Sequence, residues 1–241
     1  MGKVYLVGAG LGTVAYLTVR AQQLLTQAEV LVYDALVEDS ELLQLISSDC
    51  LKFDVGKRGG KPSTPQAEIN HLLVEQCQQR KQVVRLKSGD PFIFGRSSSE
   101  IQALLAAGCP FEVVPGISSA LAAPLLAGIP LTDPVMSRGF AVVTAHEPDA
   151  LDWETLARME TLVILMGGRH LGEIVYQLQR HSCSSQTPIA IIRWAGYPQQ
   201  QIWTGTLADI VKKTAGVSLS PSVIVIGEVV SVREYLQVPN Q

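Results

Sequence analysis

The first half of the chain alternates short apolar, β-branched runs with segments of helical spacing, and this alternation constrains the fold most. Strands joined through helices run parallel, and such a sheet is covered by helices on both faces. The expected strands are Val4–Val7, Val30–Tyr33, Leu51–Val55, Val83–Leu86 and Phe111–Val114, and the expected helices are Thr18–Ala28, Ala67–Arg80 and a segment from Ser97 through Ala107. The first half is therefore predicted to be an α/β domain with a mainly parallel sheet.

The second half has more strands and fewer helical segments. The expected strands are Phe140–Thr144, Thr161–Met166, Pro188–Trp194, Gln201–Thr206 and Val223–Val229. The fourth of these follows the third closely, which predicts a hairpin and hence a mixed sheet. We therefore divide the chain into a domain of residues 1–116 and a domain of residues 117–241.

Two helix starts carry capping signals. Thr64 precedes Pro65, a combination that predicts an N-cap followed by proline at the first helical position. Ser97 and Glu100 have the spacing of a capping box.

The composition excludes several classes of protein. The 241 residues carry a net charge of −3, which disfavours nucleic-acid binding because phosphates require a basic face. The longest apolar stretch, Val113–Leu131, is broken by three prolines and does not read as a membrane span. The N-terminus does not resemble a signal peptide, so we expect a cytoplasmic protein.

The four cysteines are Cys50, Cys77, Cys109 and Cys183. They are far apart, and none has a second cysteine or a histidine at metal-ligand spacing. The sequence therefore predicts reduced thiols and no metal site.

The first strand runs into a glycine loop, Gly8-Ala9-Gly10-Leu11-Gly12. Gly10, Gly12 and Ala15 fit the dinucleotide fingerprint, and the acid Asp34 ends the next strand. A nicotinamide-dependent dehydrogenase and a plain strand-to-helix turn are both open on this evidence. Three further glycine-containing turns follow apolar strands, at residues 56–60, 88–91 and 115–119, whereas a simple dinucleotide domain would concentrate its signal in the first loop.

Longer motifs resemble the tetrapyrrole methylases in order along nearly the whole chain. They are Gly8–Gly12, Val32–Val37, Arg85–Arg96 (RLKSGDPFIFGR), Val113–Ala120 (VVPGISSA), Gly128–Thr132 (GIPLT), Leu165–Gly167, Thr204–Leu207 and Gly227–Val230. Two more segments, Gly56–Arg58 and Pro65–Asn70, resemble the branch of the family that acts on uroporphyrinogen III.

The resemblance implies a fold, a reaction and an assembly. The fold would be two α/β domains of the tetrapyrrole methylase type, with the active site in the cleft between them. The reaction would transfer two methyl groups from S-adenosyl-L-methionine to uroporphyrinogen III, giving precorrin-2 by way of precorrin-1 for sirohaem or cobalamin, and releasing S-adenosyl-L-homocysteine. No metal is required, no membrane or nucleic acid is involved, and the family is usually homodimeric.

The resemblance also implies roles for single residues. Asp34 would be the proton acceptor and Lys57 a proton donor, although a turn carboxylate and a solvated loop lysine are the alternatives. The substrate carries eight carboxylates, and the candidates to bind them are Arg58, Lys61 and Arg96, with Lys87 and Arg138 as further possibilities. Arginine binds a carboxylate through two parallel hydrogen bonds, which favours Arg58 and Arg96.

The residues that match donor contacts in the family are Gly10, Leu11, Ser88, Gly89, Asp90, Ile93, Ser118, Ser119, Met166 and Ala195. Asp90 is equally explained as a turn residue before proline, the two serines as a helix cap, and Met166 as a core residue.

The sequence departs from the family pattern in two places. Leu11, Thr13 and Val14 replace the two prolines and the acid usual in the first loop, and Ser88 replaces a glycine. The second change is mild if Ser88 has a negative φ. A methylase of another tetrapyrrole and a non-catalytic tetrapyrrole-binding protein remain alternatives.

Overall fold

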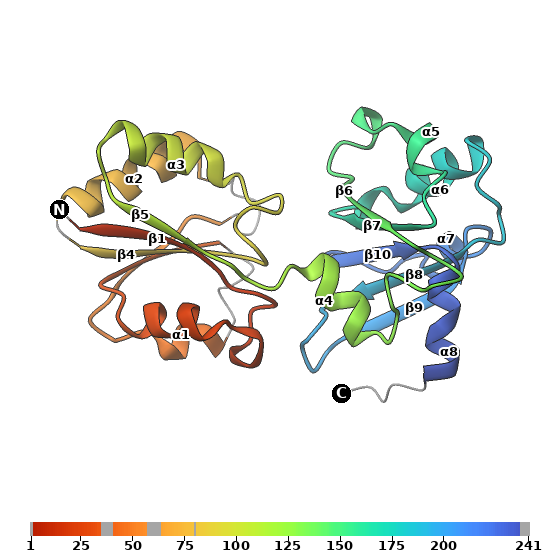
Figure 1. Cartoon of the computed structure of the whole chain (residues 1–241), viewed down its shortest axis with the longest axis horizontal. Helices are drawn as coiled ribbons and strands as arrows, with labels where there is room; N and C mark the ends of the chain where they lie inside the picture. Colours follow the sequence, from red (N-terminus) through yellow and green to blue (C-terminus); the bar gives the residue numbers. More distant parts are fainter. Residues whose placement is uncertain (1, 35–40, 57–63, 80, 237–241) are drawn as a thin grey trace. The chain divides into compact units, whose positions relative to one another are not determined.

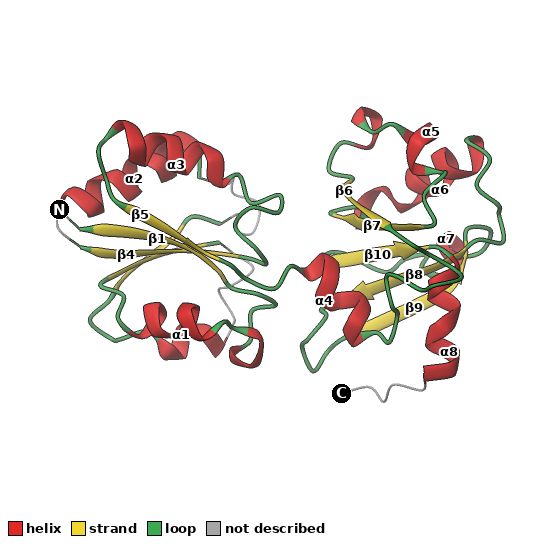
Figure 2. Ribbon diagram, in the orientation of Figure 1, coloured by secondary structure: helices red, strands yellow, loops and turns green. Residues whose placement is uncertain are grey.

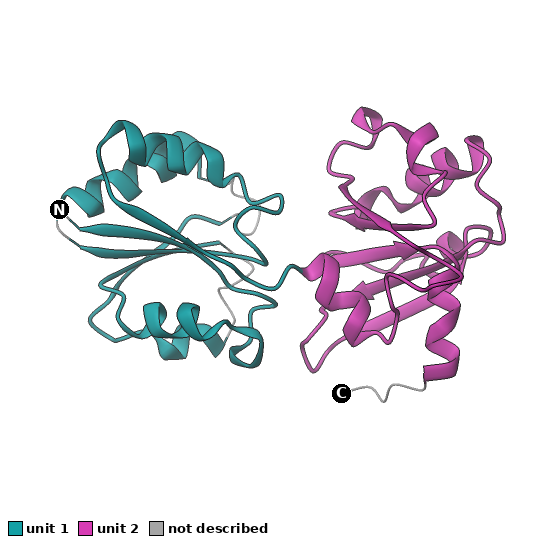
Figure 3. Ribbon diagram, in the orientation of Figure 1, with its two compact units in different colours: residues 1–118 teal, residues 119–241 magenta. Residues whose placement is uncertain are grey.

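A computed structural model of the chain describes residues 2–34, 41–56, 64–79 and 81–236. It divides into two compact units, with the division between Ser118 and Ser119 (Figure 3). Each unit is built around a five-stranded sheet of its own.

The sheet of the first unit is parallel throughout, with strand order β3-β2-β4-β1-β5. Its strands are β1 (Lys3–Gly8), β2 (Val30–Tyr33), β3 (Leu51–Asp54), β4 (Gln82–Lys87) and β5 (Phe111–Val114). Each strand lies within one residue of its predicted bounds, so the alternation identified the strands and their direction correctly.

Helices cover both faces of this sheet, as Figures 1 and 2 show. The helical segments are η1 (Val14–Tyr16), α1 (Val19–Thr26), η3 (Glu41–Leu45), α2 (Gln66–Gln78) and α3 (Ser97–Ala106). On one face α1 buries Leu24 and Leu25 against Leu31 of β2. On the other face, Leu73 of α2 and Leu104 of α3 pack with the β1 and β2 side chains that point the opposite way. Alternate strand residues therefore supply two separate cores, as expected for a sheet buried on both sides.

Both predicted helix starts differ in detail from the structure. The N-cap of α2 is Pro65 rather than Thr64, and no side chain caps it. The predicted capping box is wrong, because Ser97 is already the first helical residue and its hydroxyl donates to the Pro91 carbonyl at 2.6 Å. Glu100 is fully buried in ion pairs instead of capping the helix.

The second unit has the predicted mixed sheet, and its strand order is β6-β7-β10-β8-β9. Its strands are β6 (Phe140–Thr144), β7 (Thr161–Leu165), β8 (Pro188–Arg193), β9 (Gln201–Thr206) and β10 (Ser222–Ile226). β6 and β7 are parallel, whereas β8 and β9 form the predicted antiparallel pair. Met166 and Trp194, predicted as strand ends, leave the sheet with φ of 57° and 53°.

The second sheet is also covered on both faces (Figure 2). Its helical segments are α4 (Ser119–Leu126), η4 (Pro148–Ala150), α5 (Trp153–Leu156), η5 (Gly168–His170), α6 (Leu171–Arg180), α7 (Ile210–Lys213), η6 (Glu228–Val232) and α8 (Arg233–Leu236). α4 and η6 contribute to one core, and α5, α6 and α7 to the other. Among the described residues, no helix is long and apolar enough to span a bilayer.

Glu112 connects three elements of the first unit. Its carboxylate accepts hydrogen bonds from Lys3 Nζ of β1 at 2.8 Å and from Arg20 Nε of α1 at 3.0 Å. The Arg20 hydrogen bond, followed by that of Lys3, lowers the pKa of Glu112 from 4.5 to about 2. Because the pKa is lower in the folded state, this pairing stabilises the fold above pH 4.5 and the stabilisation is lost as the pH falls toward 2.

We therefore expect Glu112→Gln to lower the free energy of unfolding at neutral pH but to have progressively less effect as the pH falls from 4.5 toward 2. Urea unfolding of both proteins across this range is the measurement. A difference between the two proteins that does not change with pH would contradict the assignment.

Candidate active site

The loops after three neighbouring strands meet at the carboxyl edge of the first sheet. β1 lies between β4 and β5, so the loops that follow these strands are adjacent. The Gly89 N–H donates to the Gly10 carbonyl at 2.9 Å, and the Gly10 N–H donates to the Gly89 carbonyl at 3.2 Å. Both glycines have positive φ, 58° for Gly10 and 67° for Gly89, a conformation that other residues adopt only with strain.

Gly8 and Gly116 make the closest approach at this edge. A Cβ on Gly8 would lie 2.5 Å from the Gly116 nitrogen and 2.6 Å from the Gly89 oxygen. A Cβ on Gly116 would collide with the Gly89 oxygen and lie 2.7 Å from the Gly8 Cα. Neither φ is positive, so here it is lack of space rather than backbone conformation that requires glycine.

Asp90 holds two of these loops together. One carboxylate oxygen accepts from the Phe92 N–H at 2.8 Å and the other from the Gly116 N–H at 3.2 Å. The turn role left open by the sequence is therefore real. It does not use every lone pair of the carboxylate, which retains capacity for a ligand donor.

Two buried hydroxyl oxygens at this edge have no hydrogen-bond partner within the described part of the chain, namely Thr13 Oγ1 and Ser88 Oγ. Buried polar atoms are normally paired, so these two are suited to a ligand or an ordered water. Ser88 is not among the described residues with positive φ, so its replacement of the usual glycine is mild. Leu11 of the first loop is buried.

A chain of four charged residues lies on the face covered by α2 and α3. The guanidinium of Arg85 donates to Asp34 Oδ1 at 2.7 Å and to Glu100 Oε1 at 3.0 Å. Lys87 Nζ donates to both oxygens of Glu100, at 2.9 and 2.8 Å. The Asp34 side chain is 35% exposed, whereas those of Arg85 and Lys87 are each 3% exposed and that of Glu100 is inaccessible.

Burial lowers the pKa of Lys87, and the positive charge of Arg85 lowers it further against the opposing effect of Glu100. Burial also acts to lower the pKa of Arg85, but attraction to Asp34 and Glu100 outweighs it and the net shift is upward. Lys87 is thus committed to Glu100 and does not offer its ammonium group to a substrate carboxylate, contrary to one sequence expectation.

The loop after Asp90 presents exposed side chains. Ile93 and its neighbours Phe92 and Phe94 are exposed, and the Ile93 N–H donates to the Asp90 carbonyl at 3.2 Å. Arg96 is also exposed, and its φ of 55° places it in the left-handed region at the start of α3. Arg96 is thus available to an acidic ligand.

The second sheet has a comparable edge. β6, β7 and β8 all run in the same direction, so Met166 after β7 and Ala195 after β8 follow strand ends on one side of that sheet. Met166 is half exposed, so it is not the core residue that its type suggested. Trp194 packs edge-on against Tyr197 with ring centroids 5.7 Å apart. Left-handed backbone at non-glycine residues such as Met166 and Trp194 is concentrated at functional sites.

The remaining predicted residues are placed as follows. Ser118 is buried at the end of the first unit, and Ser119 begins α4. Arg138 precedes β6, and its N–H donates to Glu160 before β7, so it lies at the opposite edge of the second sheet from Met166. Lys57, Arg58 and Lys61 lie outside the described residues.

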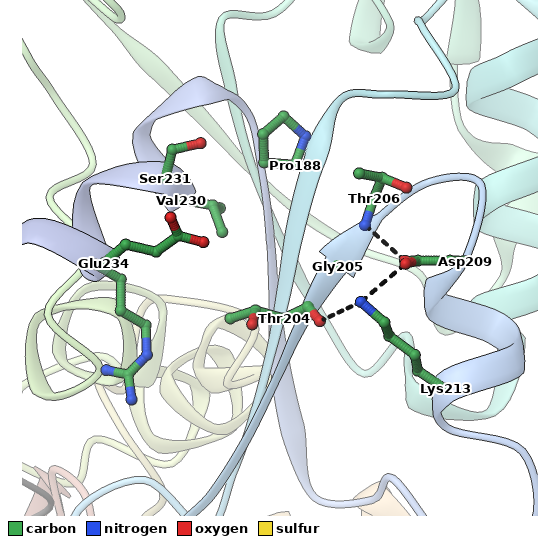
Figure 4. Close-up of a pocket in the computed structure, with 10 residues that line it drawn as sticks. Pro188, Thr204, Gly205, Thr206, Asp209, Lys213, Val230, Ser231 and Glu234 are labelled. Carbon is green, nitrogen blue, oxygen red and sulfur yellow. Dashed lines mark hydrogen bonds and ion pairs between the residues drawn. The ribbon is translucent and has the colours of Figure 1, made fainter.

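A hollow of about 450 Å³ in the second unit is not part of either edge just described (Figure 4). It is lined by the end of β9, the start of β8 and the η6–α8 segment, away from Met166. Its cations are already paired, because Lys213 contacts Asp209 at 2.8 Å and Arg233 donates to the Ala127 carbonyl. In the part of the chain that the structure describes, no three His, Cys, Asp or Glu side chains gather as a metal site.

The strand order excludes a dinucleotide-binding arrangement around the first loop. In that arrangement the glycine loop opens the first helix and the acid ends the strand next to β1. Here α1 begins only at Val19, and β4 separates β1 from β2 and Asp34. Asp34 faces Arg85 instead of a ribose position beside the loop.

The chain matches one protein family along most of its length. Residues 3–211 match the family model of the Tetrapyrrole (Corrin/Porphyrin) Methylases, and the chain belongs to this family. It is 60% identical over 234 residues to uroporphyrinogen-III C-methyltransferase of Synechococcus elongatus, covering 97% of this chain and 96% of the relative.

Two other relatives extend this comparison. The siroheme synthase of Sodalis glossinidius is 48% identical over 95% of this chain, which spans only 49% of that relative. The crystal structure of uroporphyrin-III C-methyl transferase from Thermus thermophilus complexed with S-adenyl homocysteine has a TM-score of 0.82 at 36% identity, covering 96% of this chain and all of that one.

We expect Gly116→Ala to destabilise the first unit by about 2 kcal/mol or more, because the added methyl group has no room between Gly8 and Gly89. Gly139→Ala is the matched control, since a Cβ there meets nothing within 4 Å, and we expect a change of at most about 0.5 kcal/mol. Chemical denaturation measures both. Equal effects of the two substitutions would contradict the packing described here.

Proposed function

We propose that the chain transfers methyl groups from S-adenosyl-L-methionine to two ring carbons of uroporphyrinogen III, giving precorrin-2 by way of precorrin-1. The observation that carries this proposal is the 60% identity to the Synechococcus elongatus enzyme over nearly the full length of both chains. A methylase of a different tetrapyrrole would be expected to share the fold without this level of identity. Precorrin-2 would then supply sirohaem, cobalamin or both.

The residues at the sheet edges suit the methyl donor. When bound, S-adenosyl-L-methionine would supply an electrophilic methyl carbon, which forms a bond to the electron-rich substrate carbon as its bond to sulfur breaks and S-adenosyl-L-homocysteine leaves. Gly8, Gly10 and Gly116 let the backbones of the loops pack closely at this edge, and Ser88 and Asp90 offer polar atoms to the donor. Because the reaction needs no covalent enzyme intermediate, orientation of the reacting groups is the main contribution of the protein.

The other members of the proposed donor site are Leu11, Ile93, Ser118, Ser119, Met166 and Ala195. Met166 and Ile93 are exposed enough to make apolar contacts.

Asp34 is the proposed proton acceptor. The Arg85 guanidinium fixes one of its oxygens, and the side chain remains partly open to solvent at the carboxyl edge. A carboxylate held in this way is oriented and still has lone pairs to receive the proton that the macrocycle loses, away from the methylated carbon, when it rearranges. Lys57 remains the proposed proton donor.

The substrate carboxylates would be bound by arginine and lysine side chains, since the protein as a whole is acidic. Arg96 is exposed beside the proposed donor loops. Arg58 and Lys61 complete the proposed set. We also expect a cytoplasmic homodimer, and a monomeric mass by light scattering would contradict the predicted assembly.

The proposed reaction is tested anaerobically with uroporphyrinogen III and S-adenosyl-L-methionine. We expect a product heavier by two methyl groups, formed through a singly methylated intermediate, together with S-adenosyl-L-homocysteine. A parallel panel of later, already methylated precorrins decides between family branches. Methylation of one of these in place of uroporphyrinogen III would overturn the substrate assignment, and binding without turnover would indicate a non-catalytic protein.

We expect Asp34→Asn to reduce turnover by about 100-fold or more while leaving the affinity for S-adenosyl-L-homocysteine unchanged, because asparagine keeps the shape but does not accept the proton. Single-turnover kinetics and isothermal titration measure these two quantities. Glu112→Gln also replaces an ion-paired carboxylate of the first unit and should retain full activity at neutral pH. An active Asp34→Asn enzyme would exclude this residue as the proton acceptor.

A further inference from the structure

The buried charges beside Asp34 do not balance one another. Arg85 and Lys87 are positive and Glu100 is negative, so these three almost inaccessible side chains carry a net charge of +1. Asp34 supplies the missing negative charge at the solvent-accessible end of the chain of contacts. A smaller cluster, Arg85 with Asp34, would already be neutral, so the additional Lys87–Glu100 pair requires an explanation.

The geometry of Arg85 indicates what that pair does. Each guanidinium nitrogen has its own acceptor: Nη2 donates to Asp34 at 2.7 Å, Nε to Glu100 at 3.0 Å, and Nη1 to the Leu86 carbonyl at 3.2 Å. Three acceptors in different directions prevent the planar group from turning. Glu100 would by itself compete with Asp34 for the charge of Arg85. However, both carboxylate oxygens of Glu100 also accept hydrogen bonds from Lys87 Nζ.

We propose that Lys87 and Glu100 are positioning residues for Asp34. Lys87 neutralises the charge of Glu100, so Arg85 remains a fixed cation behind the Asp34 carboxylate, and no other buried group among the described residues compensates its charge. This inference rests on the proposed role of Asp34 as the proton acceptor. It adds a reason for two buried residues that touch neither the reacting atoms nor solvent.

The chain of contacts orients Asp34 and does not relay protons. Arginine stays protonated in proteins, so it interrupts any proton path between Asp34 and Glu100. The charged groups that act on Lys87 are Arg85, Glu100 and Asp34, and those that act on Arg85 are Asp34 and Glu100. Within the described part of the chain, the charged groups that shift the pKa values of Lys87 and Arg85 are therefore members of the cluster itself.

Substitutions that change this charge in a known direction give the test. Lys87→Met leaves Arg85 and Glu100, with a net charge of 0 behind Asp34. The double variant Lys87→Met with Glu100→Gln leaves Arg85 alone, with the wild-type charge of +1. Glu100→Gln leaves a net charge of +2 behind Asp34, or +1 if the buried lysine loses its proton. The net charge in this variant is therefore never lower than in the wild-type protein. Glutamine at position 100 can still accept the Arg85 hydrogen bond, so the orientation is kept.

The readout is the ionisation of Asp34 itself, which is measured by ¹³C NMR titration of its carboxyl carbon. The signal of this carbon is assigned by its loss in Asp34→Asn. We expect the midpoint in Lys87→Met to lie above that of the wild-type protein, because a carboxylate that loses a nearby positive charge is protonated more readily. The double variant should return the midpoint to the wild-type value, and Glu100→Gln should not raise it. The acid limb of the plot of kcat against pH should shift among these variants in the same order.

Glu112→Gln is the matched control for Glu100→Gln, because it breaks ion pairs to Lys3 and Arg20 without touching the cluster, and its Asp34 midpoint should equal that of wild type. If Lys87→Met does not fold, Lys87→Gln replaces it in both the single and the double variant. A purely structural role predicts a different order, in which the double variant disturbs Asp34 at least as much as either single variant.

The proposal would be overturned if the double variant disturbed Asp34 at least as much as either single variant did. It would also be overturned by an unchanged Asp34 midpoint in the folded Lys87 variant. The NMR titration needs no substrate, so the inference is decided even if the protein proves inactive on uroporphyrinogen III. An inactive protein with the expected NMR order would refute the proposed function alone. Full methylation of uroporphyrinogen III with the wrong order would refute the positioning role alone.

Discussion

The contact on which the first unit depends is the meeting of backbone from the ends of β1, β4 and β5. Gly8 and Gly116 lack a Cβ at the two points where a Cβ would overlap a neighbouring main chain. This closeness brings the Gly116 N–H within reach of the Asp90 carboxylate and allows Gly10 and Gly89 to exchange hydrogen bonds. The three loops are therefore joined through their backbones at this edge, and the exposed side chains of Phe92, Ile93 and Phe94 lie beside that junction.

Stability alone is a weak explanation for the buried charges beside this junction. Removing charged groups from water costs several kcal/mol for each ion, and well-packed apolar residues often replace a buried ion pair without loss. The same face of the sheet has an apolar core built on α2 and α3, so the fold has that alternative available. We therefore attribute the presence of Arg85, Lys87 and Glu100 at this buried position to their proposed effect on the orientation and charge environment of Asp34, which is partly exposed at the end of the cluster.

The sequence predicted the strands of both sheets closely because apolar runs bounded by turns leave little choice of position. It could not predict the strand order, which depends on contacts between residues far apart in the chain, and the order decides which loops meet. Glu100 shows how a local pattern misleads. Its spacing from Ser97 fits a capping box, but tertiary burial beside Lys87 and Arg85 outweighs the small free energy of a cap. The signal that would have identified it is two basic residues inside an otherwise apolar strand.

The glycine fingerprint in the first loop illustrates the same limit for function. Gly10 and Gly12 have the positive φ angles that the pattern implies, so the local interpretation of the turn is correct. What the turn binds depends on the strands beside it. Because β4 lies between β1 and β2, the loop faces Gly89, and Asp34 is held by Arg85 on the neighbouring strand. An acid that would bind a ribose in one strand order is thereby placed, in this one, beside Arg85, where we propose that it accepts a proton.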